Sequence, residues 1–292
     1  MDKEKLITIL IVQKGYGMDN RPIGVFDSGV GGLTTVRELH KILPNENIVY
    51  FGDTGRVPYG TRSRQTIKKY AVQDIKYLKT FDVKAVVIAC GTVSSNVTKA
   101  DIDEVGLDIP YTGVVLPAVK EACTASAIGR IGVIATPATI KSGAYESALC
   151  GINPKAKLFS VAAPLLVPLV ENGMTDISNQ ITRLALEMYL DIFMKEKVDT
   201  LILGCTHYPL LRDIAADILG SSVKLIDSGA CAAKEIKEMM AQKNIFANAE
   251  KGKTIYRVTD SVENFASVAA NFLFENIEAC TEYVDTDIIS AL

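Results

Sequence analysis

Short apolar runs alternate with amphipathic segments along most of the chain. A run of about four to six β-branched or aromatic residues, bounded by glycine or polar residues, is typical of a buried parallel strand. Such runs predict strands at residues 23–26, 48–51, 86–89, 111–115, 131–135, 157–162, 200–203, 223–226 and 254–258. Between them, apolar residues recur at helical spacing, most extensively over residues 175–196. Strands that alternate with helices predict an α/β fold with mainly parallel sheets.

An internal repeat divides this pattern into two halves. Residues 81–90 resemble residues 196–205, an offset of 115 (205 − 90), and residues 23–25 resemble residues 131–133, an offset of 108 (131 − 23). Two nearly equal offsets predict two similar lobes, each a mainly parallel sheet flanked by helices, related by a pseudo-twofold axis. Ligands of open α/β sheets bind at the carboxyl ends of the strands. Cys90 and Cys205, at the ends of two repeated runs, are therefore expected to face each other across a cleft.

Composition narrows the class of protein. A chain of 292 residues with 48% apolar and 22% charged residues is an ordinary globular protein, long enough for two domains. The net charge of −3 gives no reason to expect the clustered positive charge with which proteins bind nucleic acid. Six cysteines without a CxxC pair, and two histidines, predict free thiols in a reducing compartment and no zinc site. The apolar run at residues 6–12 is too short for a membrane span. Residues 1–17 are predicted to be either a disordered extension or the result of a misassigned start.

Two facing thiols suit inversion at a carbon stereocentre. One thiolate removes a proton from the carbon, and the other thiol delivers a proton to the opposite face. A cysteine has a reference pKa of about 8.5, and a helix that starts after the strand lowers it. This chemistry requires no metal or cofactor. The alternative is that Cys90 and Cys205 are small buried apolar residues. The shared context, in which Thr92 and Thr206 lie close behind the cysteines, favours the catalytic interpretation.

Polar residues near the strand ends extend the candidate site. Asp27 and Ser28 follow the first strand, where a carboxylate can receive a substrate ammonium or assist a nearby thiol, although both residues are also ordinary turn formers. The glycine-rich stretch at residues 29–32 matches neither of the common phosphate-binding patterns. His207, two residues after Cys205, can assist proton movement at that thiol.

Several separate motifs, in order along the chain, closely resemble those of the glutamate racemases. They comprise residues 23–34, 51–54, 58–60, the Cys90 strand, and residues 136–139, 168–171 and 204–209. The resemblance covers about residues 21–285. It implies a cofactor-independent isomerase that interconverts L- and D-glutamate for peptidoglycan synthesis in a bacterial cytoplasm. It also implies a homodimer with no membrane attachment and no direct contact with nucleic acid.

The resemblance also assigns residues. It makes Cys90 and Cys205 the two proton-transferring thiols, with Asp27 assisting the first and His207 and Glu171 the second. The implied substrate contacts are Asp27, Ser28, Pro58, Tyr59, Gly60, Gly91, Thr92, Thr136, Thr206 and His207. The site would lie between lobe 1, residues 18–116 plus 225–292, and lobe 2, residues 117–224.

One position departs from the family pattern, which usually has asparagine after the first thiol where this chain has Gly91. The glycine removes an amide that would contact the substrate, so Gly91→Asn is expected to lower KM or leave it unchanged. A clear rise would show that the glycine is a fitted part of the site. Two alternatives stay open: a relative acting on aspartate or another amino acid, and a binding protein that has kept the fold without the chemistry.

Overall fold

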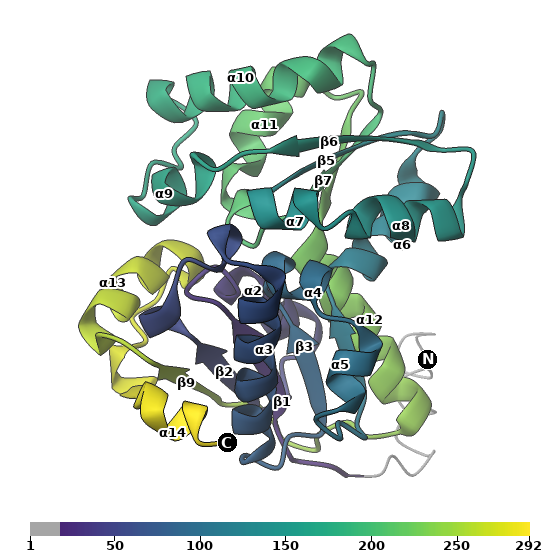
Figure 1. The fold of residues 1–292 in the computed structure, drawn as a ribbon. Coiled ribbons are helices and arrows are strands. Elements are labelled where there is room, and N and C mark those ends of the chain that lie inside the picture. The colour runs from purple at the N-terminus through teal and green to yellow at the C-terminus, as the bar shows by residue number, and fades with distance from the viewer. Residues whose placement is uncertain (1–17) are drawn as a thin grey trace, which may run out of the picture.

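The computed structural model describes residues 18–292, which form two parallel sheets flanked by helices (Figure 1). Within these residues, the first sheet has the strand order β10 (Thr281–Tyr283), β9 (Thr254–Val258), β2 (Ile48–Gly52), β1 (Ile23–Asp27), β3 (Ala85–Ile88) and β4 (Tyr111–Gly113). The second has the order β6 (Lys157–Ala162), β5 (Arg130–Ala135), β7 (Thr200–Leu203) and β8 (Lys224–Asp227). All of these pairings are parallel, which confirms the predicted fold class. The extension predicted at residues 1–17 lies outside the described residues.

The helices form two groups, one around each sheet (Figure 1). Around the first sheet lie α2 (Leu33–Ile42), α3 (Arg64–Lys79), α4 (Gly91–Asn96), α5 (Lys99–Asp103), α12 (Ser228–Lys243), α13 (Val262–Leu273) and α14 (Thr286–Ser290). Around the second lie α6 (Val115–Ala125), α7 (Pro137–Lys141), α8 (Ala144–Ile152), α9 (Leu166–Glu171), α10 (Gln180–Lys195) and α11 (Arg212–Leu219). Short 3₁₀ turns span Thr54–Arg56, Tyr59–Thr61, Tyr208–Leu211 and Glu278–Cys280. None of the described helices is both long and apolar enough to cross a lipid bilayer.

Burial explains why the strands are uniformly apolar in sequence. Every residue of β1, β2, β3 and β7 is buried, because helices cover both faces of these strands. Helix α10 starts later than the pattern at residues 175–196 predicted. The side chain of Asn179 accepts a hydrogen bond from the backbone N–H of Thr182 at 3.0 Å and caps the helix there.

The sequence repeat is also a structural repeat. In the first sheet, β3 pairs with β1 so that Ile23 is opposite Ala85. In the second, β7 pairs with β5 so that Ile131 is opposite Thr200, the equivalent register. The turn before each thiol strand contains a non-glycine residue with φ of 50°, Asp82 in one case and Lys197 in the other. The two thiol strands therefore occupy equivalent places in the two sheets.

The chain crosses between the sheets twice. It leaves the first sheet after β4 and returns to it at β9, so the carboxyl-terminal part of the chain completes the sheet that the amino-terminal part begins. Helix α12 lies at the junction and packs against both α2 and α6. The division into lobes at 116/117 and 224/225 stays a prediction; β8 pairs with β7 as far as Asp227, slightly beyond the second boundary.

Candidate active site

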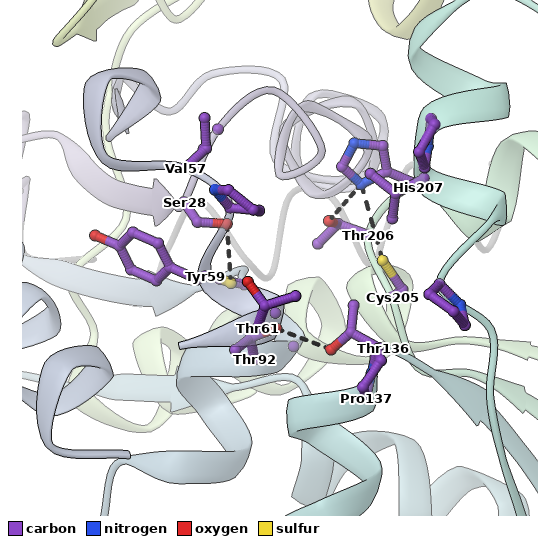
Figure 2. Close-up of a pocket in the computed structure, with 18 of the residues that line it drawn as sticks. Ser28, Val57, Tyr59, Thr61, Thr92, Thr136, Pro137, Cys205, Thr206 and His207 are labelled. Atoms are coloured by element: carbon purple, nitrogen blue, oxygen red, sulfur yellow. Dashed lines mark hydrogen bonds between the residues drawn. The ribbon is translucent and has the colours of Figure 1, made fainter. Parts of the chain in front are cut away.

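One cavity of about 420 Å³ lies where the carboxyl ends of β1, β3, β5 and β7 approach one another (Figure 2). This volume is within the usual range for small-molecule sites. Apart from Asp27, which is buried behind it, each residue assigned by the resemblance lines the cavity: Ser28, Pro58, Tyr59, Gly60, Cys90, Gly91, Thr92, Thr136, Glu171, Cys205, Thr206 and His207. The fold thus brings together residues from four separate strand ends.

Further lining residues were not predicted as site residues, although Gly29, Pro137, Pro168 and Gly204 lie within the motifs given above. They are Gly29, Val57, Thr61, Pro137, Pro164, Val167, Pro168 and Gly204. The sequence positions of some of these residues could have indicated that they line the cavity. Val57 and Thr61 flank the motif at residues 58–60, and Val167 precedes Glu171 by four residues, which places both on one face of α9.

The two thiols occupy matching positions at the ends of buried strands. Cys90 follows β3 and is the N-cap residue of α4, and Cys205 follows β7. Both are free thiols, with 4% of Cys90 and 6% of Cys205 exposed. Across residues 18–292, no group of three or more histidine, cysteine, aspartate or glutamate residues is placed to hold a metal ion.

The surroundings of Cys90 are polar but deeply buried. Its Sγ lies 3.4 Å from Ser28 Oγ. Burial, reinforced by the charge of Asp27, raises the pKa of Cys90 to about 12. Asp27 accepts a hydrogen bond from the Gly29 N–H through Oδ2 at 3.1 Å, while its Oδ1 has no partner among the described residues. Burial raises the pKa of Asp27, and the charge of His207 opposes that rise.

Cys205 belongs to a chain of three polar groups. Its Sγ lies 3.8 Å from His207 Nδ1 (Figure 2). On the other side of the ring, His207 Nε2 lies 2.8 Å from Glu171 Oε1. Phe272 packs edge-on against the imidazole. Burial lowers the pKa of His207, but the hydrogen bonds with Cys205 and Glu171 outweigh it and raise that pKa to about 10. At neutral pH the ring is therefore an imidazolium held between the thiol and the carboxylate.

Tyr59 lines the cavity, and its ring points away from Cys205 (Figure 2). The hydroxyl donates to Asp53 Oδ2 and lies 3.2 Å from Asp74 Oδ2. Arg56 joins the same two carboxylates, at 2.7 Å from Asp53 and 2.8 Å from Asp74. This buried network lies beneath the loop at residues 57–61 and holds the loop at the edge of the cavity.

Hydrogen bonds across the cleft join residues from the two sheets. Thr92 Oγ1 lies 3.0 Å from Thr136 Oγ1, and Thr136 also caps α7 (Figure 2). On the other side of the thiols, Thr34 Oγ1 donates to the carbonyl of Thr206 at 2.9 Å. These bonds fix the spacing of the segments that carry Cys90 and Cys205.

Comparison with known proteins gives consistent results. The profile of the Asp/Glu/Hydantoin racemase family matches residues 23–236. A glutamate racemase from Streptococcus thermophilus is 45% identical over 272 residues, which are 92% of this chain and 98% of that protein. A glutamate racemase from Geobacter metallireducens is 41% identical over 254 residues, 87% of this chain and 93% of that protein.

Solved structures agree with the sequence comparison. The glutamate racemase isoform RacE1 from Bacillus anthracis superposes with a TM-score of 0.86 at 38% identity, covering 91% of this chain and 98% of that one. The glutamate racemase from Francisella tularensis in complex with D-glutamate gives a TM-score of 0.85 at 40% identity, covering 93% of this chain and 100% of that one.

Proposed function

The chain belongs to the Asp/Glu/hydantoin racemase family, and within it to the glutamate racemases, and on this premise we propose that it interconverts L- and D-glutamate. The observation that carries the proposal is the pair of buried thiols, Cys90 and Cys205, at equivalent strand ends of one cavity. A relative of similar size and fold binds D-glutamate.

In the proposed reaction, the two thiols act on opposite faces of the substrate α-carbon. A thiolate takes the α-proton, so the C–H bond breaks, an S–H bond forms and the electron pair stays on carbon. The second thiol then gives its proton to the other face, so a new C–H bond forms and that sulfur becomes the thiolate. The reaction consumes no oxidant, reductant or water, and its products are the opposite enantiomer and an enzyme with its proton relocated.

The two thiols have different charged neighbours, His207 beside Cys205 and Asp27 near Cys90. The His207 imidazolium lies at hydrogen-bond range of the Cys205 sulfur, where it can donate to that atom during proton transfer. Burial and the charge of Asp27 keep Cys90 protonated, with a pKa of about 12.

The remaining cavity residues are proposed to hold the amino acid. Ser28, Thr92, Thr136 and Thr206 bring hydroxyl groups to the cavity wall, and these can bond to the substrate carboxylates. The buried Asp27 is proposed to assist Cys90 and to attract the substrate ammonium. Water is excluded as the substrate fills the cavity, which strengthens each of these interactions.

We also propose the wider roles that family membership brings. The enzyme is a homodimer in the bacterial cytoplasm and supplies D-glutamate for peptidoglycan. Analytical ultracentrifugation tests the assembly, because a dimer has twice the 31.6 kDa mass of the chain.

The test of the proposed activity is racemisation followed by circular dichroism. L-glutamate and D-glutamate are each supplied to the purified protein without added cofactor. L-aspartate is supplied in a separate assay as the alternative substrate. In heavy water, deuterium is expected first in the product enantiomer, because each face of the carbon meets its own thiol. If the protein racemises aspartate in preference to glutamate, its substrate is aspartate and not glutamate. Inactivity toward both amino acids would reject the proposed function.

A further inference from the structure

The residues beside the two thiols touch through their backbones. Gly91 follows Cys90, and Gly204 precedes Cys205. A Cβ added to Gly91 would lie 2.5 Å from the carbonyl oxygen of Gly204 and 3.9 Å from the Cα of Cys205. Ordinary van der Waals contacts of a Cβ start at 3.4 Å, so a side chain at position 91 overlaps the opposite backbone by about 1 Å.

A second glycine limits the position of the same segment from the other side. A Cβ on Gly31 would overlap Thr206 Oγ1 and lie 2.5 Å from His207 Nδ1. Residues 204–207 therefore lie against Gly31 and Gly91, both from the first-sheet side of the cleft. The obstacle at Gly31 consists of side chains, which can rotate, whereas the obstacle at Gly91 is a carbonyl of the main chain.

We propose that Gly91 is a positioning residue: its missing side chain lets the two thiol-bearing segments touch, and this contact sets the separation of Cys90 and Cys205 across the substrate. The inference rests on the proposed racemase function. It replaces the expectation that an asparagine at this position would improve binding. A side chain here acts first as a wedge, because the carbonyl of Gly204 occupies the space that its Cβ requires.

If the proposal holds, a substitution at Gly91 changes kcat much more than it changes KM. The variants keep the cavity hydroxyl groups that are proposed to hold the substrate, whereas proton transfer needs both sulfurs within reach of the α-carbon. A misplacement of about 1 Å can reduce a rate about 100-fold. Gly91→Ala and Gly91→Asn are each expected to lower kcat about 10- to 100-fold in both directions, with KM changed less than about threefold.

The matched control is Gly151→Ala. Gly151 lies in α8 outside the cavity, and a Cβ there meets nothing within 4 Å, so the same substitution is expected to leave kcat and KM unchanged. Full kcat in Gly91→Ala, or a lowered KM with unchanged kcat in Gly91→Asn, would overturn the proposal. An inactive wild-type protein would instead reject the proposed function, which keeps the two failures distinct.

A crystal structure of the wild-type protein with D-glutamate tests the proposal without any variant, and so applies even if the Gly91 variants do not fold. The constructed Cβ position of Gly91 is expected to stay within 3 Å of the Gly204 oxygen when the ligand is bound. A separation of 3.4 Å or more, where a real Cβ fits, would overturn the proposal.

Discussion

His207 and Glu171 form a 2.8 Å hydrogen bond between Nε2 and Oε1, on the side of the imidazole that faces away from Cys205. His207 is buried, whereas 42% of the Glu171 side chain is exposed. The carboxylate therefore reaches the buried ring from the open end of the cavity. Its charge contributes to the raised pKa of His207 and holds the ring toward the thiol.

Glu171→Gln is expected to lower the pKa of His207, because the imidazolium loses its negative partner. Exposure of Glu171 to solvent screens the pair, so the expected loss in kcat is modest, about 2- to 5-fold. The pH profile of kcat is the decisive measurement, and its alkaline limb is expected to move to lower pH. Glu187→Gln, with the same charge change on the surface of α10, is the control and is expected to leave the profile in place. An unmoved profile in Glu171→Gln would contradict the assignment.

The raised pKa of His207 also makes a prediction about stability. The folded protein holds this proton up to a pKa of about 10, whereas the unfolded chain releases it at about 6.5. The stabilisation is therefore fully present below pH 6.5 and is lost as the pH rises toward 10, at up to about 1.4 kcal/mol per pH unit. Urea unfolding at pH 7, 8 and 9 is expected to show the advantage of wild type over His207→Asn shrinking at each step. A constant difference would show that His207 is neutral in the folded protein.

Each thiol is expected to be indispensable. A serine hydroxyl at position 90 or 205 is far less acidic than a thiol, so neither Cys90→Ser nor Cys205→Ser leaves a competent base. Each substitution is expected to lower kcat/KM more than about 1,000-fold in both directions. Cys150→Ser changes an exposed thiol outside the cavity and is the control. Substantial activity in either cavity variant would exclude a mechanism that uses both sulfurs.

The sequence predicted the features of the site that depend on local pattern. Cys90 and Cys205 each follow a short apolar run, and the two runs belong to the internal repeat. A parallel sheet places the residues that follow its strands at one edge. The fold class followed from the same alternation of runs and helices. These features are encoded over a few residues each, so they can be recognised without knowing how the chain packs.

Features that depend on distant contacts were not predictable in this way. The ring of Tyr59 turns into a network with Asp74 in α3 and, through Asp53, with Thr259, which is 206 positions from Asp53. The contact between Gly91 and Gly204 likewise joins segments that follow strands of different sheets. No local pattern marks either relationship, because the first forms only when β2, α3 and β9 come together around the first sheet, and the second only when the two sheets approach each other.

Tyr59→Phe tests whether that network holds the substrate loop. The substitution removes the hydroxyl that lies between the buried carboxylates of Asp53 and Asp74, and a buried polar group that loses its partner costs about 1–3 kcal/mol. Burial, together with the charge of Asp53, already raises the pKa of Asp74, so the lost donor leaves this pair less well compensated. We expect lower stability in urea together with a several-fold rise in KM, because residues 57–61 line the cavity. Tyr283→Phe removes an exposed hydroxyl and is expected to change neither quantity. A raised KM at unchanged stability would mean that the Tyr59 hydroxyl acts on the substrate directly.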